Sequence, residues 1–344
     1  MSDSPIFIIG TERSGSNLLR LILNAHSRIS VPHPPHIMNY FGPIADRYGD
    51  LHEASALEPL VDDIMKLMNV HIYPWEFAVD REQVIADTNP RTLYGVVAAI
   101  YEQHQRHDGK ARWGCKSTFM IHHVDAVLER NPDARFVWLI RDPRDVAVSS
   151  RKSVFSPFHP ALTAELWLDQ QAEGLALMEK LGEQRVLRLH YESLTQEAEE
   201  SVRKVCDFLD ETFEPGMLRF FETKDAQKSA RLSKSWENTG SPILTNNSRK
   251  YLSGLSQNEI RWVECITGEL MDRLGYEREL PVESGVSLER SSIWTRWKVR
   301  IQNMLWNMGV EWDSLRGDSN HWRRWARGST VALIQTKRQW GRKL

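Results

Sequence analysis

A glycine-rich stretch near the N-terminus, IFIIGTERSGSNLL, has the residue types and spacing of an anion-binding loop. Gly10 and Gly15 keep the spacing of the phosphate loop GxxxxGK[ST], but Ser16 and Asn17 stand where that loop has its lysine and its magnesium-binding hydroxyl. A helix beginning here directs backbone N–H groups and the positive end of its dipole at an anion, and Arg13 adds a cation. The loop therefore predicts anion binding without metal-assisted chemistry; a plain turn between a strand and a helix is the alternative.

A second charged turn lies in RFVWLIRDPRDVAVSSRK, after another apolar run. Asp142 can cap the helix that follows and Pro143 suits its first turn, which places Arg141 at the carboxyl end of a strand. The planar guanidinium of Arg141 suits phosphate oxygens, and Ser149 can offer a hydroxyl to the same anion. A structural ion pair of Arg141 is the alternative. Two anion sites at one sheet edge predict a ligand with two separated phosphate groups.

The elements that must position these residues alternate between short β runs and amphipathic helices, which is typical of an α/β fold with a parallel sheet covered on both faces. In such a sheet, ligands gather at the carboxyl ends of the strands. The predicted strands cover residues 6–10, 28–31, 112–116, 135–140 and 185–190, and the predicted helices cover 16–25, 92–106, 120–129, 146–153, 162–181 and 197–209.

Composition limits the function classes. The chain has 344 residues, 41% of them hydrophobic, and a net charge of −2, which argues against a nucleic-acid partner. Its three cysteines are widely spaced and support neither a disulfide framework nor a thiolate metal site. His33 and His36 are separated by two prolines that break any helix between them, so no metal is expected. The sequence shows neither a signal peptide nor a long apolar run, and we expect a cytoplasmic protein.

The C-terminal part differs from the rest in charge and aromatic content. From Pro281 onward there are twelve Lys or Arg against five Asp or Glu, together with seven of the thirteen Trp. The stretch LPVESGVS has the composition of a connection, so we divide the chain into a main domain, residues 1–280, and a helical extension, residues 281–344.

The two anion-binding motifs together resemble the sulfotransferases that use 3′-phosphoadenosine 5′-phosphosulfate (PAPS). The segments LHYESL and NNSRKYLSGLS also resemble later parts of that family, and the resemblance covers about residues 5–278. It implies a three-layer P-loop-like fold, in which the first loop holds the 5′-phosphosulfate and the second motif holds the 3′-phosphate. It also implies a PAPS-dependent enzyme that forms adenosine 3′,5′-bisphosphate without a metal.

The resemblance implies a role for each matching residue. Arginine replaces the lysine that many members have at position 13, and the glycine usual near the basic pair 249–250 is missing. The residues that match the donor site are Arg13, Ser14, Gly15, Ser16 and Asn17 for the 5′-phosphosulfate, Arg141, Ser149, Arg249 and Lys250 for the 3′-phosphate, and Tyr191 for the adenine.

In-line sulfuryl transfer develops charge on the departing phosphate oxygen, which fixed cations and loop amides can stabilise. Arg13 is the first candidate, and Lys116, at the end of the strand RWGCK, is the second; a solvated lysine is its alternative. Some relatives have a basic histidine where this chain has Thr118, and others use a carboxylate after the second strand. The matching stretch here is VPHPPHIMNYF, so His36 is the predicted general base, with His33 next.

Two other function classes stay open: a P-loop-like kinase or NTPase, and a non-catalytic nucleotide-binding protein. His122 and His123 could line an acceptor pocket. The acceptor could be a small molecule or a lipid-linked one, and its accepting group a hydroxyl, a phenol or an amine. In the extension, apolar residues recur at helical spacing with basic residues between them. Such a stripe usually packs on its own protein; peripheral membrane contact and a dimer contact are the alternatives. The stripe comprises Trp294, Trp297, Ile301, Leu305 and Met308.

Overall fold

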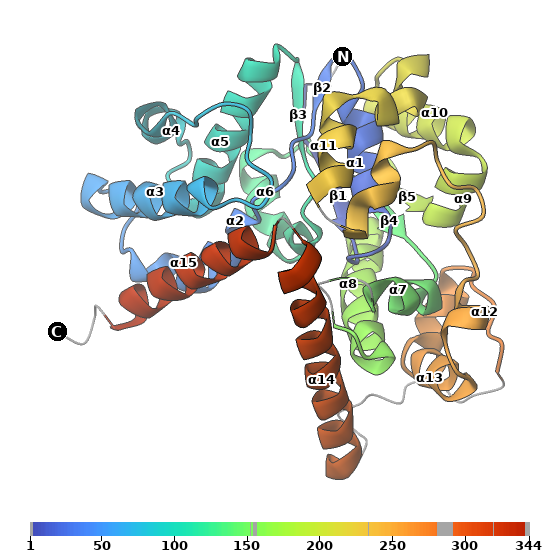
Figure 1. The fold of residues 1–344 in the computed structure, drawn as a ribbon. Coiled ribbons are helices and arrows are strands. Elements are labelled where there is room, and N and C mark those ends of the chain that lie inside the picture. The colour runs from blue at the N-terminus through green and yellow to red at the C-terminus, as the bar shows by residue number, and fades with distance from the viewer. Residues whose placement is uncertain are drawn as a thin grey trace.

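The centre of the molecule is one five-stranded parallel sheet with the strand order β2-β3-β1-β4-β5 (Figure 1). The computed structural model describes residues 3–151, 153, 157–232, 234–280, 292–318 and 320–340. Each strand lies within a predicted one, so the α/β fold with a parallel sheet is confirmed. The strands are β1 (Ile6–Gly10), β2 (Ile29–Ser30), β3 (Arg112–Cys115), β4 (Arg135–Ile140) and β5 (Val186–His190).

Helices cover both faces of the sheet. The α-helices are α1 (Ser16–Asn24), α2 (Ile37–Phe41), α3 (Ala54–Asn69), α4 (Arg81–Asp87), α5 (Leu93–Asp108), α6 (Val124–Arg130), α7 (Pro143–Ser150), α8 (Pro160–Leu181), α9 (Tyr191–Gln196), α10 (Ala198–Leu209), α11 (Lys224–Leu232), α12 (Tyr251–Gly254), α13 (Gln257–Arg273), α14 (Ile293–Gly317) and α15 (His321–Trp340). Short 3₁₀ helices are η1 (Gly42–Arg47), η2 (Thr118–His123), η3 (Pro215–Glu222) and η4 (Lys234–Gly240).

The central strands β1 and β4 are buried on both faces because nearly every residue in them is apolar. In β1, Phe7 and Ile9 face a core shared with α3, α5 and α8, whereas Ile6 and Ile8 face a core shared with α1 and α10. Burying each such side chain contributes about 1.5–3 kcal/mol. These two apolar runs place the sheet in the middle of three layers, and polar residues follow where β1 and β4 end.

Several helices of the structure have no counterpart among the predicted ones. Helix α3 is one example, and it contains Pro59, a residue that normally argues against a helix interior. Helix α13 is another, although it begins with a capping box between Ser256 and Glu259.

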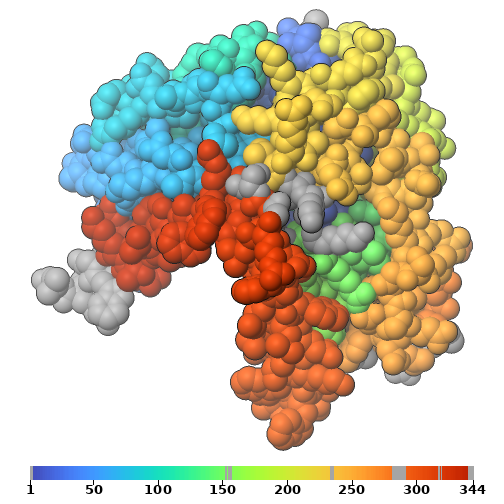
Figure 2. All heavy atoms as spheres, viewed as in Figure 1, coloured from blue at the N-terminus to red at the C-terminus, as the bar shows by residue number. Residues whose placement is uncertain are grey.

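The extension consists of α14 and α15, and the predicted connection, residues 281–291, lies outside the described residues. Helix α15 packs against α3 and η1, where Arg338 pairs with Asp63 at 2.7 Å. Helix α14 contacts the body along one face and projects from it (Figure 1, Figure 2). The expectation that the Trp-rich stripe packs on the body is wrong, because its side chains are 47–81% exposed. Among the described helices, none is long and apolar enough to cross a bilayer.

Candidate active site

A cavity of about 580 Å³ opens at the carboxyl edge of the sheet. Because β3, β1, β4 and β5 are parallel neighbours, the segments that follow them meet there. The predicted site residues that line the cavity are Arg13, Gly15, Ser16, Asn17, His33, His36, Lys116, Arg141, Ser149, Tyr191 and Lys250.

The loop after β1 needs its glycines. Gly10 has φ +135, and a Cβ on it would lie 2.2 Å from the carbonyl oxygen of Leu139 in β4. Gly15 has φ +89, and a Cβ there would lie 2.3 Å from Cδ2 of Tyr191. Gly15 is also the N-cap of α1 and has no side chain to cap the helix. The first N–H groups of α1 are therefore available to an anion in the cavity.

The two anion-binding motifs are joined by direct contacts. The Nε of Arg13 donates a hydrogen bond to Oγ of Ser149 in α7 at 3.2 Å, and Nη1 of Arg141 donates to the carbonyl oxygen of Arg13 at 3.0 Å. Arg13 itself adopts a left-handed conformation, with φ 69, that non-glycine residues rarely adopt. Burial, followed by the charge of Arg141, lowers the pKa of Arg13 to about 10.

Arg141 is held in place on several sides. Its guanidinium lies 4.3 Å from the ring centroid of Tyr191, and its Nη2 donates to the carbonyl oxygen of Asn247 at 3.0 Å. The amide of Asn247 donates in turn to the hydroxyl of Tyr191. Tyr191 therefore packs between the glycine loop and Arg141, and connects the loop to the segment around residue 247.

Several polar atoms around the cavity have no hydrogen-bond partner among the described residues. Three that can donate to an anion are Oγ of Ser14, Nδ2 of Asn17 and Nε of Arg141, all buried; Oδ2 of Asp145, an acceptor, is also unpaired. The amide and guanidinium nitrogens can only donate, and the hydroxyl can donate too, so this set fits a ligand rich in acceptor oxygens. Leaving such groups unpaired costs roughly 1–3 kcal/mol each, which a bound anion would offset.

Lys116, at the end of β3, also lines the cavity. Burial, followed by the charge of Arg20, lowers the pKa of Lys116 to about 8. Its ammonium is thus charged at neutral pH but loses its proton far more readily than an exposed lysine.

The two histidines of the VPHPPH stretch have different environments. His36 is partly exposed, its Nδ1 lies 2.9 Å from Oγ of Ser117, and its backbone is left-handed with φ 57. His33 is almost fully buried and stacks on Tyr73 at 5.0 Å, with Trp236 at 4.9 Å. Burial is the main reason that both imidazoles have a pKa well below the usual value, so both are neutral at pH 7.

Not every predicted residue lines the cavity. Arg249 is exposed and pairs with Glu279 at 3.3 Å, while Lys250 next to it lines the cavity. Outside the lining, His122 pairs with Glu173 at 2.9 Å. That pair and Asp169 form a group in the described chain that could hold a metal ion, but none of the three lines the cavity.

The lining also contains residues that were not predicted, among them Asn247, Trp236 and Arg327. Asn247 and Trp236 lie in the segment after α11, where neighbouring polar residues gave no reason to select them. Arg327 comes from α15 in the extension, and its guanidinium lies 5.8 Å from the ring centroid of Tyr40. Only the packing of α15 on the body brings Arg327 to the cavity, so no sequence signal could have identified it.

A parallel sheet whose first strand runs into a glycine loop and a helix defines a protein of the P-loop-like α/β class. The comparison with protein families is more specific: the model of the sulfotransferase family matches residues 5–215, and the chain belongs to that family.

Two relatives and two solved structures are also similar to this chain, and the solved structures show the same fold. Protein-tyrosine sulfotransferase A of Caenorhabditis elegans is 22% identical over 287 residues, 79% of this chain and 67% of that protein. An uncharacterized protein of Aquifex aeolicus (strain VF5) is 25% identical over 242 residues, 67% of this chain but only 28% of that protein. The sulfotransferase domain of the Synechococcus PCC 7002 olefin synthase has a TM-score of 0.53 and 22% identity, covering 81% of this chain and 97% of that one. The domain from the curacin biosynthetic pathway has a TM-score of 0.54 and 20% identity, covering 80% and 99%.

Proposed function

We propose that the protein transfers the sulfuryl group of PAPS to a hydroxyl of an acceptor, with a phenol or an amine as the alternative accepting group. The observation that carries the proposal is the junction of the two anion-binding motifs through Arg13, Ser149 and Arg141 in one cavity. A donor with a phosphosulfate at one end and a phosphate at the other has two anionic groups for these two motifs.

In this proposal the glycine loop binds the phosphosulfate through the N–H groups that begin α1 and through the amide of Asn17. Arg141 and Lys250 bind the 3′-phosphate, and the ring of Tyr191 supports the nucleoside between them. Arg249 contributes little, because its side chain pairs with Glu279 instead.

Transfer forms a bond between sulfur and the acceptor oxygen while the bond from sulfur to the bridging oxygen breaks. The leaving nucleotide keeps that electron pair, and Arg13 and Lys116 stabilise the charge that develops on it. Cations already fixed in the cavity need no reorganisation during the step, so no metal is required in this scheme.

The acceptor proton passes to His36. When Nδ1 donates its proton to Ser117, Nε2 has a free lone pair and can act as the base. The lowered pKa keeps that imidazole neutral and competent at pH 7. His33 is the second candidate, since both of its ring nitrogens lack a partner among the described residues, but its stacking on Tyr73 holds it more tightly.

A thermal-shift comparison tests the proposal. PAPS and adenosine 3′,5′-bisphosphate should each raise the melting temperature, and ATP with magnesium should not, because Ser16 replaces the lysine that nucleoside triphosphates require. Stabilisation by ATP with magnesium alone would favour the kinase or NTPase class. Acceptor mixtures incubated with enzyme and PAPS can be searched for sulfated product by mass spectrometry. If PAPS and the bisphosphate bind but no sulfated product forms, a non-catalytic binding protein is favoured.

A further inference from the structure

Exposed apolar side chains are concentrated in the extension. Thirteen of the fifteen large apolar side chains that are exposed in the described part of the chain lie on α14 and α15. Six of the thirteen are tryptophans. A surface this apolar usually marks an interaction site. The thirteen are Ile293, Trp294, Trp297, Ile301, Met304, Leu305, Trp306, Met308, Trp312, Leu315, Trp322, Trp325 and Leu333.

Helix α14 has two faces with different roles. One face contacts the body: Val299 is buried, and Oδ1 of Asn303 accepts hydrogen bonds from the backbone N–H groups of Phe158 and His159 at 2.8 and 2.9 Å. These contacts fix the orientation of the helix, so its opposite face is presented to the outside.

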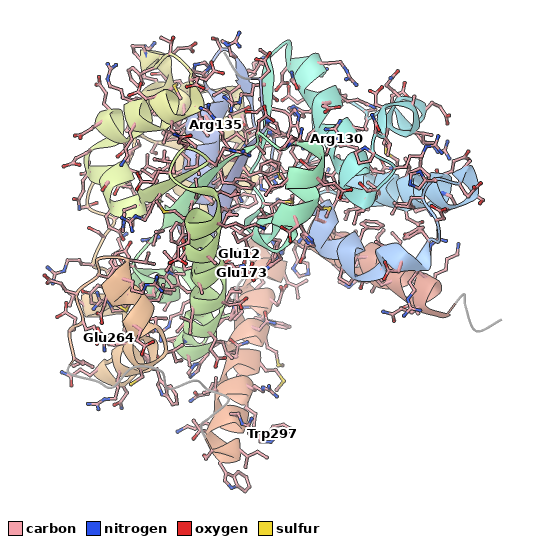
Figure 3. The ribbon with its side chains drawn as sticks, turned by 180° about the vertical axis from the view of Figure 1, so that it is seen from behind. Glu12, Arg130, Arg135, Glu173, Glu264 and Trp297 are labelled. Atoms are coloured by element: carbon pink, nitrogen blue, oxygen red, sulfur yellow. The ribbon has the colours of Figure 1, made fainter. Side chains whose placement is uncertain are left out.

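At 100° per residue, most of the exposed apolar side chains of α14 fall on the side opposite Val299 and Asn303; Trp306 is the exception and stacks on His159 of the body. We name the stripe of Trp294, Trp297, Ile301, Leu305, Met308, Trp312 and Leu315 the outer stripe of α14. It runs over about 30 Å of helix, from 1.5 Å of rise per residue. Figure 3, seen from behind, shows Trp297 on the part of α14 that lies away from the sheet.

Basic side chains flank the outer stripe. By the same helical geometry, Lys298 and Arg316 lie along one edge of the stripe, and Arg296 and Arg300 lie beyond the other edge. The segment from Pro281 onward carries twelve Lys or Arg against five Asp or Glu, whereas the preceding residues carry an acidic excess. The positive charge is therefore concentrated where the apolar surface is.

We propose that α14 docks the protein on an anionic lipid surface, with the outer stripe in the headgroup region and the flanking cations against lipid phosphates. Tryptophan suits this boundary because its ring is apolar while its N–H stays near water. A symmetric pair of chains is a poorer occupant, since pairing the same stripe would bring the basic edges of both copies together. The docking needs no donor nucleotide and does not rest on the proposed function.

Helix α15, which follows α14 in the chain, reaches the cavity. Asn320, in the turn after α14, donates from Nδ2 to the carbonyl oxygen of Leu232 at 3.0 Å, and α15 then brings Arg327 to the cavity wall. A bilayer in contact with α14 would thus lie close to Arg327, the residue of the extension that lines the cavity. An acceptor hydroxyl on a lipid or a lipid-linked molecule fits this arrangement, and this last step alone rests on the proposed function.

Vesicle flotation of the full chain tests the docking. We expect the protein to float with phosphatidylcholine vesicles that contain phosphatidylglycerol at low salt, and much less with pure phosphatidylcholine or at high salt. Leu305→Glu should reduce the bound fraction at least about tenfold, because it places a charge in the stripe. Leu252→Glu is the matched control, since Leu252 on α12 is 55% exposed and Leu305 is 56% exposed. The control should float like the unaltered chain.

Lys298→Glu combined with Arg316→Glu should abolish the preference for the anionic vesicles. Three results would each overturn the docking: no flotation with anionic vesicles at low salt, equal flotation of the Leu305 and Leu252 variants, or a dimer in ultracentrifugation that Leu305→Glu dissociates without any vesicle binding. Calorimetry with adenosine 3′,5′-bisphosphate on the same variants separates this question from the proposed function, because donor binding should be the same in all of them.

Discussion

Arg141→Ala should weaken the binding of adenosine 3′,5′-bisphosphate strongly. In the structure both Nη groups of Arg141 already donate to carbonyl oxygens, of Arg13 and Asn247, while Nε has no partner among the described residues. The ligand therefore gains one charge-assisted hydrogen bond and the proximity of a cation. Such a contact contributes about 1.5–3 kcal/mol, which corresponds to a Kd increase between about 10-fold and about 150-fold.

The same substitution should also lower stability. It leaves the carbonyl oxygens of Arg13 and Asn247 without their donor and removes the cation from the ring of Tyr191, so we expect a loss of roughly 1–3 kcal/mol in the free energy of unfolding. Binding must therefore be measured by calorimetry well below the melting temperature of the variant.

Arg188→Ala is the matched control for that measurement. Arg188 lies on the neighbouring strand β5, but its side chain is exposed and does not line the cavity. Its removal should change neither the Kd nor the melting temperature appreciably. If Arg141→Ala bound the bisphosphate as tightly as Arg188→Ala does, the role of Arg141 in the phosphate site would be refuted.

Three further predictions concern the chemistry and the loop. As pH rises through about 8, Lys116 loses its charge, so kcat/KM for the donor should fall; Lys116→Arg should move this fall to higher pH, and an unmoved pH profile would exclude the ammonium as its cause. His36→Ala should lower kcat by about 10²–10⁴ without changing the Kd of the bisphosphate, and near-normal turnover of the variant would assign the base elsewhere. In the unaltered enzyme the His36 imidazole should stay neutral as pH falls through 6.5, because burial lowers its pKa. Gly15→Ala should abolish donor binding because its Cβ would overlap Tyr191, whereas Gly216→Ala, where nothing lies within 4 Å, should bind normally; equal binding by both variants would show that the loop tolerates a side chain.

The sheet and its loops could be predicted because each strand is a short apolar run followed by a polar turn. Arg141 is an example: the run RFVWLI before it and Asp142 after it fix the end of β4. What could not be predicted is contact across strands. The hydrogen bond from Arg13 to Ser149 joins residues 136 positions apart, and it exists because β1 and β4 are neighbours in the sheet.

Side-chain direction was equally inaccessible from the sequence. Arg249 and Lys250 are adjacent and chemically alike, yet only Lys250 lines the cavity. The backbone at Arg249 is left-handed, with φ 54, and its side chain pairs with Glu279 instead. In the extension, helical spacing identified an apolar stripe correctly, but spacing alone does not say whether a stripe faces the body or the outside. The contacts of Asn303 on the opposite face decide that question.

The cavity wall carries five Lys or Arg side chains and three carboxylates, and burial raises the pKa of one of these carboxyls, Asp145. Burial is the main cause of the lowered pKa values of Arg13 and Lys116, and the neighbouring cations Arg141 and Arg20 add to it, so positive charge in this cavity is costly without a ligand. If the cavity binds an anionic nucleotide, as proposed, that nucleotide should stabilise the folded protein. Proteases cleave the unfolded fraction, so nucleotide supply should set the lifetime of the protein as well as its activity. If the donor is PAPS, we expect cells starved of sulfate to hold less of this protein.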